Sequence, residues 1–256
     1  MKLSCIETML DDVPLEEKFA ILGRAGFDGI DLRGDLVGDR AAEINDLARR
    51  TGIEVATVYG RLPTSLLGDS VAERAETVGT IRTRLTDAAA VGAQWLIVVP
   101  VFGEARIFGG DATELTVLTV LLHELEPAAR EAGVQILLEP LNQRETHLLR
   151  SPRVGATLTR PFDSPFIATM ADTYHMDLEG QDAVAEVRTA GDQLRLVHLS
   201  DRERTLPGEG GIDFAPLISF LNGQRYDGYF GFECRGPLPE ERLRRSVEFV
   251  RNLGSS

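Results

Sequence analysis

Short apolar runs alternate with amphipathic stretches along the whole chain. The runs are rich in Val, Ile, Leu and Phe, which is typical of buried strands. The stretches between them repeat apolar residues at helical spacing, and the first has Pro14 suited to a first turn and Gly26 to an exit. Near-continuous apolar strands separated by helices predict parallel strands that are covered on both faces. The predicted strands lie at 3–7, 29–32, 53–58, 94–100, 134–139, 166–172, 194–199 and 228–233. The predicted helices lie at 14–26, 39–52, 70–92, 114–132, 151–160, 181–190, 213–222 and 237–253.

One polar, chemically active residue stands at the end of each of the last four predicted strands. These residues are Glu139, Asp172, His198 and Glu233. They recur at intervals of roughly 30 residues, the length of one βαβ unit. In a flat, doubly wound sheet the outer two would lie about 14 Å apart, at roughly 4.8 Å per strand. Closing the sheet into a barrel aims all four at a common centre. We therefore predict one α/β domain over residues 1–256, a (β/α)₈ TIM barrel with its active site at the C-terminal ends of the strands.

The composition narrows the class of protein. A length of 256 residues suits one barrel domain, and a hydrophobic fraction of 43% is ample for its core. No apolar run reaches the roughly 18 residues that span a membrane, and the N-terminal segment has no apolar stretch typical of an export signal. We expect a cytoplasmic protein with no membrane partner, in which Cys5 and Cys234 are reduced and buried. A net charge of −13 disfavours nucleic acid as a partner, because phosphate binding relies on clustered Lys and Arg.

The four strand-end residues predict a metal site. Three carboxylates and one imidazole that converge would repel one another, and a divalent cation reduces their formal charge from −3 to −1. Mostly oxygen ligands with one nitrogen suit Mn²⁺, Mg²⁺ or Co²⁺. Taken singly, each residue has an ordinary explanation as a strand-end acid or a satisfied core histidine. Four on successive strands favour a shared site for one divalent metal ion.

Four segments resemble one enzyme superfamily. They read "LLEPLNQRET", "ADTYHMDLEG", "VHLSDRERTLPGEGGIDF" and "YDGYFGFE". The chain resembles the xylose-isomerase-like TIM-barrel superfamily from its first strand to its last helix, and within it the branch of D-tagatose/D-psicose 3-epimerases and hydroxypyruvate isomerases. The resemblance implies a metal-dependent isomerase of carbohydrate metabolism, either a ketose 3-epimerase or a hydroxypyruvate-isomerase-like enzyme. It also implies a small sugar or keto acid as substrate and a homodimer or homotetramer as the assembly.

The resemblance implies a role for each motif residue. The metal ion would be bound by Glu139, Asp172, His198 and Glu233. Of these, Glu139 and Glu233 would also be the catalytic acid–base pair on opposite faces of the substrate. The residues expected to contact the substrate are Glu145, His175 and Arg204, with His175 in a loop after a strand end. The run 142–144 departs from the arginine and aromatic usual in epimerase-like relatives, which leaves the substrate open.

The chemistry explains why these groups are needed together. Removing a proton from a carbon next to a carbonyl builds negative charge on oxygen, and a carboxylate with a pKa near 4.3 is a weak base for this task. A divalent cation stabilises the enediolate as a Lewis acid, and positioned acid–base groups add about 10² to 10⁴ in rate. A base on one face and an acid on the other inverts a stereocentre. Proton movement between adjacent carbons isomerises an aldose to a ketose instead. Because Lys is scarce near the predicted rim, we expect an unphosphorylated substrate.

Other polar residues near the predicted rim have ordinary explanations. The glycine-rich segment 207–213 is interpreted as a loop ending in an Asp213 N-cap rather than as a ligand cradle. His123 is interpreted as structural because it lies in a predicted helix, and His147 is left open. Glu104 and Arg106 follow the fourth strand, where a barrel places substrate contacts, but a solvated surface pair is the preferred interpretation.

Other functions stay open on the sequence. A keto-inositol (inosose) dehydratase of the same superfamily would share the metal and the enolate, and formation of a double bond would distinguish it. A TIM-barrel glycoside hydrolase would use two carboxylates about 5 Å apart but has no use for Asp172 and His198. An abasic-site endonuclease would need many histidines, whereas this chain has four. A sugar-binding barrel would not need the glutamate pair.

Overall fold

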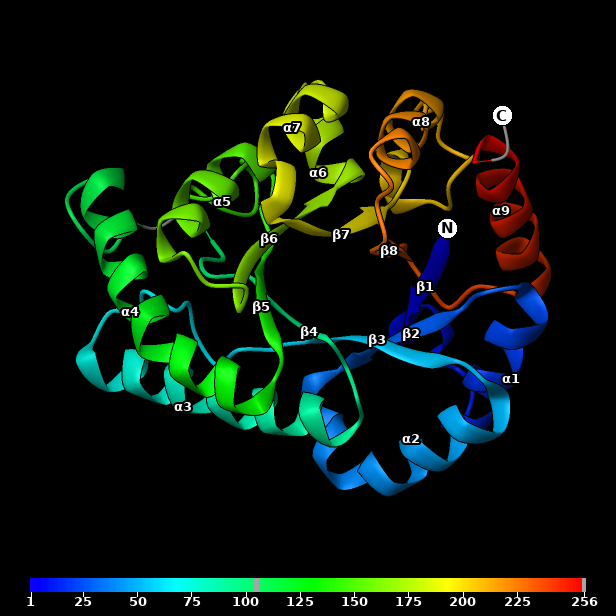
Figure 1. Ribbon diagram of the computed structural model, residues 1–256, viewed down its shortest axis with the longest axis horizontal. Coiled ribbons are helices and arrows are strands. Elements are labelled where there is room, and N and C mark those ends of the chain that lie inside the picture. Colours follow the sequence, from blue (N-terminus) through cyan, green and yellow to red (C-terminus); the bar gives the residue numbers. More distant parts are fainter. Residues whose placement is uncertain (104–105, 255–256) are drawn as a thin grey trace.

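The eight strands form a closed parallel barrel in the computed structural model, which describes residues 1–103 and 106–254. Neighbours in the sequence pair in order, and β8 closes the ring against β1. Figure 1 shows the helices arranged around this ring. The predicted fold class is therefore confirmed. The strands are β1 (Lys2–Ile6), β2 (Gly29–Arg33), β3 (Glu54–Tyr59), β4 (Trp95–Val98), β5 (Gln135–Leu138), β6 (Ile167–Asp172), β7 (Leu194–Leu199) and β8 (Tyr229–Phe232).

The helices largely follow the predicted ranges. The α-helices are α1 (Leu15–Ala25), α2 (Val37–Thr51), α3 (Val71–Ala90), α4 (Asp111–Ala132), α5 (Pro152–Thr159), α6 (Thr173–Leu178), α7 (Ala183–Ala190), α8 (Ala215–Gly223) and α9 (Glu240–Leu253). Short 3₁₀ turns are η1 (Glu7–Leu10), η2 (Gly34–Leu36), η3 (Arg160–Phe162), η4 (Gly191–Gln193) and η5 (Arg202–Arg204).

Helix α6 is the one α-helix of the described chain that the apolar pattern did not predict. It starts directly after β6 because the Asp172 side chain caps it, accepting hydrogen bonds from the amides of Tyr174 (2.8 Å) and His175 (3.4 Å). Six residues are too few to show helical periodicity in a sequence. The expectation that His175 lies in a loop is therefore wrong: it lies on this short helix.

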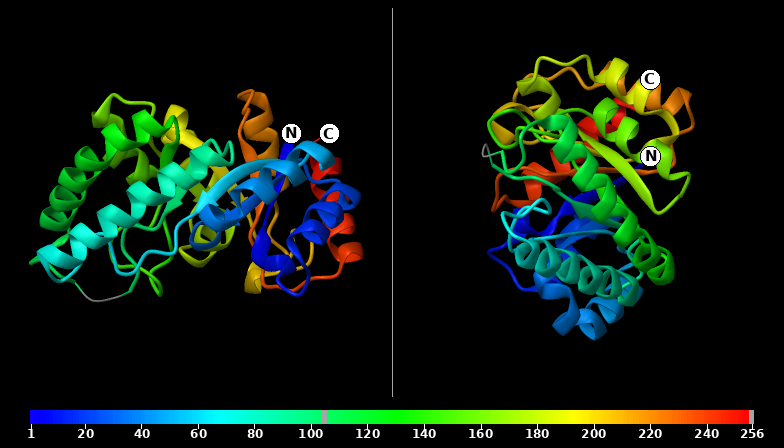
Figure 2. Two further views of the ribbon diagram at one scale, coloured as in Figure 1. Left: turned by 90° about the horizontal axis from the view of Figure 1, so that it is seen from below. Right: turned by 90° about the vertical axis from the view of Figure 1, so that its left-hand side faces the viewer.

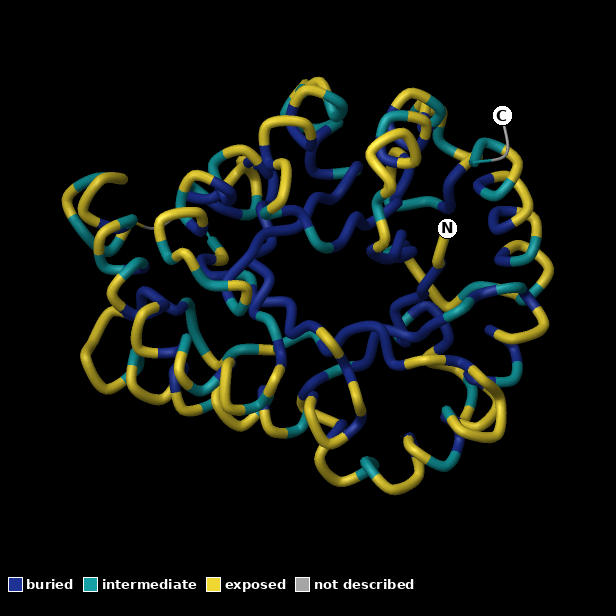
Figure 3. The backbone as a smooth tube through the Cα atoms, in the orientation of Figure 1, coloured by how far each residue is buried: buried dark blue, intermediate teal, exposed yellow. Residues whose placement is uncertain are grey.

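The strands are buried on both faces, as the near-continuous apolar runs predicted. Successive strand residues point to opposite faces, so in β4 Trp95 and Ile97 join the cluster inside the barrel while Leu96 and Val98 pack against the helices. Figure 3 shows the buried tube of the barrel surrounded by the exposed outer turns of the helices. Because apolar side chains fill the barrel, polar chemistry is confined to its rim and upper interior.

The two ends of the described chain lie side by side (Figure 2). Helix α9 packs against α1, and Arg251 donates to the carbonyl oxygen of Gly26 at 2.7 Å. No helix within 1–103 and 106–254 is both long and apolar enough to cross a membrane. Cys5 and Cys234 are free and buried, as expected.

Candidate metal centre and active site

Four strands bring the four strand-end residues to one point of the rim. Asp172 is the last residue of β6 and pairs in register with His198 of β7. Glu139 and Glu233 follow the last residues of β5 and β8 directly. One ligand atom from each of the four residues lies within 4.8 Å of the other three. The predicted convergence of these residues is confirmed, and three of the four are fully buried.

The spacing of these atoms suits a divalent cation. His198 Nδ1 lies 3.0 Å from Glu233 Oε2 and 3.9 Å from both Glu139 Oε1 and Asp172 Oδ2. Metal–ligand bonds of about 2.0 to 2.2 Å place the ligand atoms of one ion roughly 3 to 4.4 Å apart. The three carboxylates are the hard oxygen ligands that Mg²⁺ and Mn²⁺ prefer, and the imidazole nitrogen is a ligand that suits transition metals. The residues therefore fit one divalent metal ion.

Burial and mutual repulsion shift the pKa values of these groups. Burial, with the neighbouring Glu233 carboxylate, raises the pKa of Glu139 to about 8. Burial lowers the pKa of His198, but the carboxylates of Glu233, Glu139 and Asp172 outweigh it and raise that pKa to about 9. Burial opposes ionisation of Glu233 too, yet Arg204 and His198 hold its pKa well below the ordinary range. The cluster thus holds protons at neutral pH that a bound cation would displace.

Arg204 lies against the same cluster. Its Nη1 donates to Asp172 Oδ2 at 2.7 Å and to Glu233 Oε2 at 3.2 Å, and its guanidinium stacks over Tyr174 at 4.4 Å from the ring centroid. Glu203 and Arg204 both have positive φ, 59° and 57°. Two such non-glycine residues in succession are a strained backbone of the kind found at functional sites. The turn η5 therefore holds two residues in an unfavourable backbone conformation, and this conformation places the Arg204 guanidinium at the rim.

His175 lies between Arg204 and Asn142. Its Nε2 is 2.8 Å from Arg204 Nη2, and its Nδ1 is 3.1 Å from the backbone N of Asn142 and 2.8 Å from the Nδ2 of that side chain. Burial lowers the pKa of His175, which favours the neutral imidazole. A neutral imidazole accepts a hydrogen bond at one nitrogen only. The donors beside the two ring nitrogens cannot both be satisfied. One ring nitrogen of His175 can therefore donate a hydrogen bond to a substrate oxygen that takes the place of the present donor.

Asn142 is a site residue that the sequence did not single out. It is 1% exposed, and its Nδ2 donates to Glu145 Oε1 at 2.7 Å as well as meeting His175. The backbone carbonyl of Glu145 in turn accepts from Gly103 N at 2.7 Å, which ties the loop after β4 to the loop after β5. The position of Asn142 directly after the "EPL" run was the one sequence feature that could have identified it as a site residue. Asn142 therefore fixes both predicted substrate contacts on this side of the rim.

Asp31 is a second missed residue, in β2 beneath the cluster. It is fully buried and accepts hydrogen bonds from Ser4 Oγ (2.7 Å) and Thr57 Oγ1 (2.8 Å). Burial raises its pKa, and the charge of His198 opposes that shift. His198 Nε2 is buried with no hydrogen-bond partner among the described residues. Asp31 therefore acts on His198 through its charge rather than through a hydrogen bond.

The weaker sequence interpretations have mixed outcomes. In the glycine-rich loop, the amides of Gly208 and Ile212 donate to the buried Asp201, so they are not a ligand cradle, as predicted. Asp213 accepts from the amide of Ala215, although the N-cap itself is the next residue. The remaining three described residues lie in structural contacts: His123 stacks on Phe162, His147 binds the buried Glu114, and Arg106 pairs with Asp111. Glu104 lies outside the described residues.

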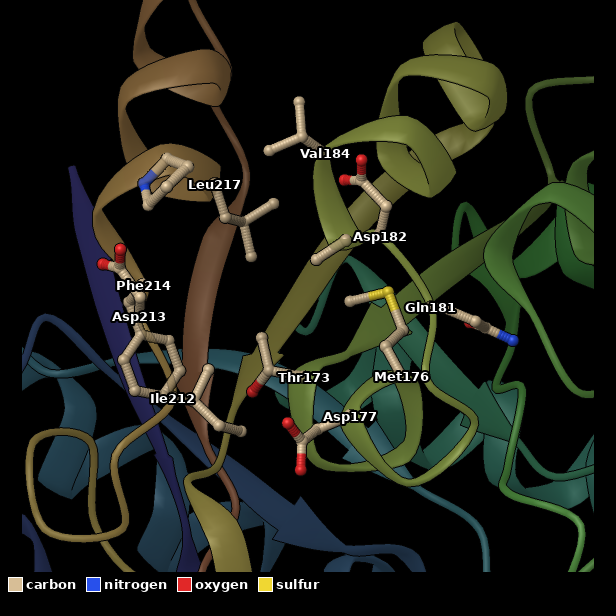
Figure 4. A pocket seen from close by; sticks show the side chains of 12 residues that line it. Thr173, Met176, Asp177, Gln181, Asp182, Val184, Ile212, Asp213, Phe214 and Leu217 are labelled. Atoms are coloured by element: carbon tan, nitrogen blue, oxygen red, sulfur yellow. The ribbon is translucent and has the colours of Figure 1, made fainter.

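A cavity of about 230 Å³ lies apart from the cluster, between α6, α7 and α8 (Figure 4). Its carboxylates already have partners. Asp182 caps α7, Asp213 accepts from the start of α8, and Asp177 pairs with Arg202 at 3.0 Å. The rest of its lining is mainly apolar, as expected where helices meet over a core. The cavity therefore adds no chemistry to the rim.

Comparison with known proteins places this geometry in a family. The family model described as xylose isomerase-like TIM barrel matches residues 19–253. The chain is similar to the 3-dehydro-D-guloside 4-epimerase of Escherichia coli (strain K12), with 27% identity over 92% of this chain and 93% of that protein. It is also similar to the L-ribulose 3-epimerase of Mesorhizobium japonicum, with 30% identity over 53% of this chain but only 46% of that protein.

A solved 4-epimerase structure agrees over nearly the whole chain. It is the 3-keto-D-glucoside 4-epimerase of E. coli, with a TM-score of 0.88 and 25% identity over 98% of this chain and 99% of that one. In sequence, the similarity to the L-ribulose 3-epimerase covers about half of each chain, whereas the similarity to the 3-dehydro-D-guloside 4-epimerase covers more than nine tenths of each. In fold, a D-psicose 3-epimerase structure agrees equally well, with a TM-score of 0.88 and 18% identity over the whole of both chains.

Proposed function

This chain belongs to the xylose isomerase-like TIM barrel family and is an isomerase, and from that premise we propose that it is a divalent-metal-dependent sugar epimerase. The reaction class is inversion of a carbon–hydrogen stereocentre next to a carbonyl. The observation that carries the proposal is the convergence of Glu139, Asp172, His198 and Glu233 at one rim. These four residues would hold the metal ion, which when bound supplies Lewis-acid stabilisation of negative charge on the substrate oxygens.

Glu139 and Glu233 are the proposed acid–base pair. They come from β5 and β8, on opposite sides of the other two ligands in the ring of strands. One glutamate removes the proton from the carbon next to the carbonyl, and the electron pair of that bond becomes the carbon–carbon double bond of an enediolate. The other glutamate delivers a proton to the opposite face, and the electron pair returns to a new carbon–hydrogen bond. The result is an inverted stereocentre and no net change in composition.

Three neighbouring side chains are proposed to orient the substrate. Arg204 and His175 meet at 2.8 Å beside the cluster, where an oxygen of the substrate can accept from the guanidinium in place of the imidazole. Glu145, held by Asn142 at 2.7 Å, can accept from a hydroxyl on the other side. Orientation of this kind matters because the carbon–hydrogen bond that breaks must be perpendicular to the plane of the developing enediolate.

The full-length similarity favours a keto-glycoside as substrate over a free ketose. The 3-dehydro-D-guloside 4-epimerase is similar over 93% of its own length, whereas the L-ribulose 3-epimerase is similar over 46% of its length. Substrate contacts in a TIM barrel come from loops of all eight strands, so similarity along the whole barrel bears more directly on the substrate. Inversion at C4 next to a C3 carbonyl is therefore the first candidate, and 3-epimerisation of a ketose is the second.

The proposal is tested by a substrate panel in D₂O. Methyl 3-keto-hexopyranosides, free ketoses, hydroxypyruvate and a keto-inositol are each incubated with the Mn²⁺-loaded protein and followed by NMR. We expect deuterium at the inverted carbon of the 3-keto glycoside, because the proton passes through a glutamate that exchanges with solvent. Inversion without deuterium, or ultraviolet absorbance from a new double bond in the keto-inositol, would contradict the proposal.

A further inference from the structure

A cavity of about 430 Å³ opens at the C-terminal ends of β3 and β4. This volume lies in the range of small-molecule sites, about 300 to 1,000 Å³. The cavity is formed by the loop after β3 and the start of the loop after β4. The lining residues that matter below are Gly60, Arg61, Leu62, Pro63, Val99 and Phe102.

The cavity lies on the same rim as the metal cluster. The amide of Gly60 donates to Ile97 O at 3.0 Å, and the amide of Glu139 donates to Val98 O at 3.0 Å. Consecutive residues of β4 therefore join the cavity wall on one side and the acid–base glutamate on the other. Two strand spacings of roughly 4.8 Å each separate β3 from β5. A ligand about 10 Å long could thus reach from Glu139 into the cavity.

The lining is more apolar than polar, and its two hydroxyl groups already have hydrogen-bond partners on neighbouring segments. Thr64 Oγ1 bonds Thr77 Oγ1 at 2.9 Å. Ser65 Oγ donates to Pro100 O at 3.2 Å and accepts from the amide of Leu67. The rest of the lining is aliphatic and aromatic apart from the Arg61 side chain. Because Arg61 is exposed, its guanidinium can stay hydrated while the apolar lining contacts a group with an apolar face.

Phe102 is the most exposed aromatic side chain of the described residues. It is 68% exposed at the edge of the cavity, an unusual place for a large apolar ring without a partner. The next residue, Gly103, donates to the carbonyl oxygen of Glu145 and forms a parallel bridge with Thr146. The ring is therefore attached to a backbone that is fixed to the loop carrying a proposed substrate contact.

We propose that this cavity is a subsite for the aglycone of a glycoside, and that it takes an aryl or alkyl aglycone stacked on Phe102. The inference rests on the proposed epimerase function, since it requires the sugar ring at the metal cluster. With the reacting carbons beside Glu139, the anomeric substituent extends toward the ends of β4 and β3. A free ketose has no such substituent and would leave the apolar lining in water.

Equilibrium binding tests the subsite without turnover. Phenyl and methyl hexopyranosides that lack the 3-keto group cannot be epimerised, and calorimetry on the Mn²⁺-loaded protein gives their dissociation constants. We expect the phenyl glycoside of one anomer to bind about tenfold more tightly, from stacking and burial of the ring. Equal affinity of phenyl and methyl glycosides in both anomeric series would overturn the inference. Tighter binding of a disaccharide than of the phenyl glycoside would overturn the apolar assignment.

Kinetics with two variants separate the subsite from the reaction. Phe102→Ala should lower kcat/KM about tenfold for a phenyl 3-keto glycoside and leave the methyl 3-keto glycoside unchanged. Val120→Ala is the matched control, because it removes an exposed apolar side chain from α4, and it should change neither value. An equal loss on both substrates in Phe102→Ala would refute the subsite. Inactivity of the unmodified protein on every keto-glycoside and ketose would instead refute the proposed epimerase, which keeps the two failures distinct.

Discussion

The ends of β5 to β8 and the ends of β3 and β4 use the same rim in opposite ways. The first region gathers three carboxylates and an imidazole with ligand atoms within 4.8 Å of one another, and Arg204 donates hydrogen bonds to two of the carboxylates. The second presents Leu62, Val99 and Phe102 around an open cavity. Charged groups packed together in a low-dielectric site are costly unless a counter-charge joins them, whereas apolar surface tolerates many ligands. The proposed reaction site and the proposed aglycone subsite therefore lie at the ends of different strands.

Removal of the metal ion should have the largest effect, and it should affect the charged region more than the apolar one. If the charged region exists to hold a cation, chelation should abolish epimerisation, and Mn²⁺, Co²⁺ or Mg²⁺ should restore it. Phenyl glycoside binding by the second region should survive in weakened form. Activity is measured after dialysis against a chelator, with metal content determined by mass spectrometry. Full turnover in a verified metal-free preparation would show that the cluster has another purpose.

Glutamine substitutions test the acid–base pair inside the charged region. Glu139→Gln and Glu233→Gln keep the side-chain size and remove the base, so each should lose about 10² to 10⁴ in kcat. Metal content is measured alongside, because each residue is also a proposed ligand. Glu131→Gln, at an exposed position of α4, is the matched control and should leave kcat nearly unchanged.

The informative result is a variant that keeps its metal and still exchanges the substrate proton with D₂O without inverting the carbon. That outcome identifies the face served by the surviving glutamate. A metal-replete variant with near wild-type kcat would mean that the acid–base pair is wrong.

Metal affinity should depend on pH in the charged region. The pKa of Glu139 is raised to about 8 by burial and by Glu233, and the pKa of His198 to about 9 by its carboxylate neighbours. Both protons must leave when a cation binds, so affinity is highest above these values and falls as the pH is lowered. We expect at least about a tenfold loss per pH unit between pH 8 and 6. Calorimetry in buffers of different ionisation enthalpy counts the released protons, and a pH-independent affinity would contradict this account.

Asp31→Asn tests whether the charged region depends on a strand from the other side of the barrel. Asp31 is fully buried in β2, and its carboxylate interacts with His198 through charge alone. Loss of this charge should weaken metal binding by about tenfold, the lower end of the effect expected for such outer partners. Asp35→Asn is the control, because that carboxylate pairs with Arg33 at 2.9 Å outside the barrel. Unchanged metal affinity in a folded Asp31→Asn protein would show that the charge of Asp31 does not support metal binding.

The strands and the candidate ligands could be predicted because both depend on local patterns. A parallel strand buried on both faces must be a run of apolar residues, and a polar residue at its end is conspicuous against that run. Residues 94–98 and Glu139 illustrate the two cases. Helix α6 escaped prediction because its short length carries no period and its start depends on the cap from Asp172.

The barrel, the four candidate ligands and their common rim could be inferred from the amino-acid sequence, since strand order and side-chain alternation follow from the apolar pattern. The hydrogen-bond partners of the polar residues around the site became visible in the three-dimensional structure alone. Asn142 contacts His175, and Asp31 accepts hydrogen bonds from Ser4 and Thr57 on the two strands beside its own. The cavity beside Phe102 likewise arises where two loops meet. Contacts of this kind depend on how the loops and strands pack in three dimensions, and no spacing along one chain encodes them.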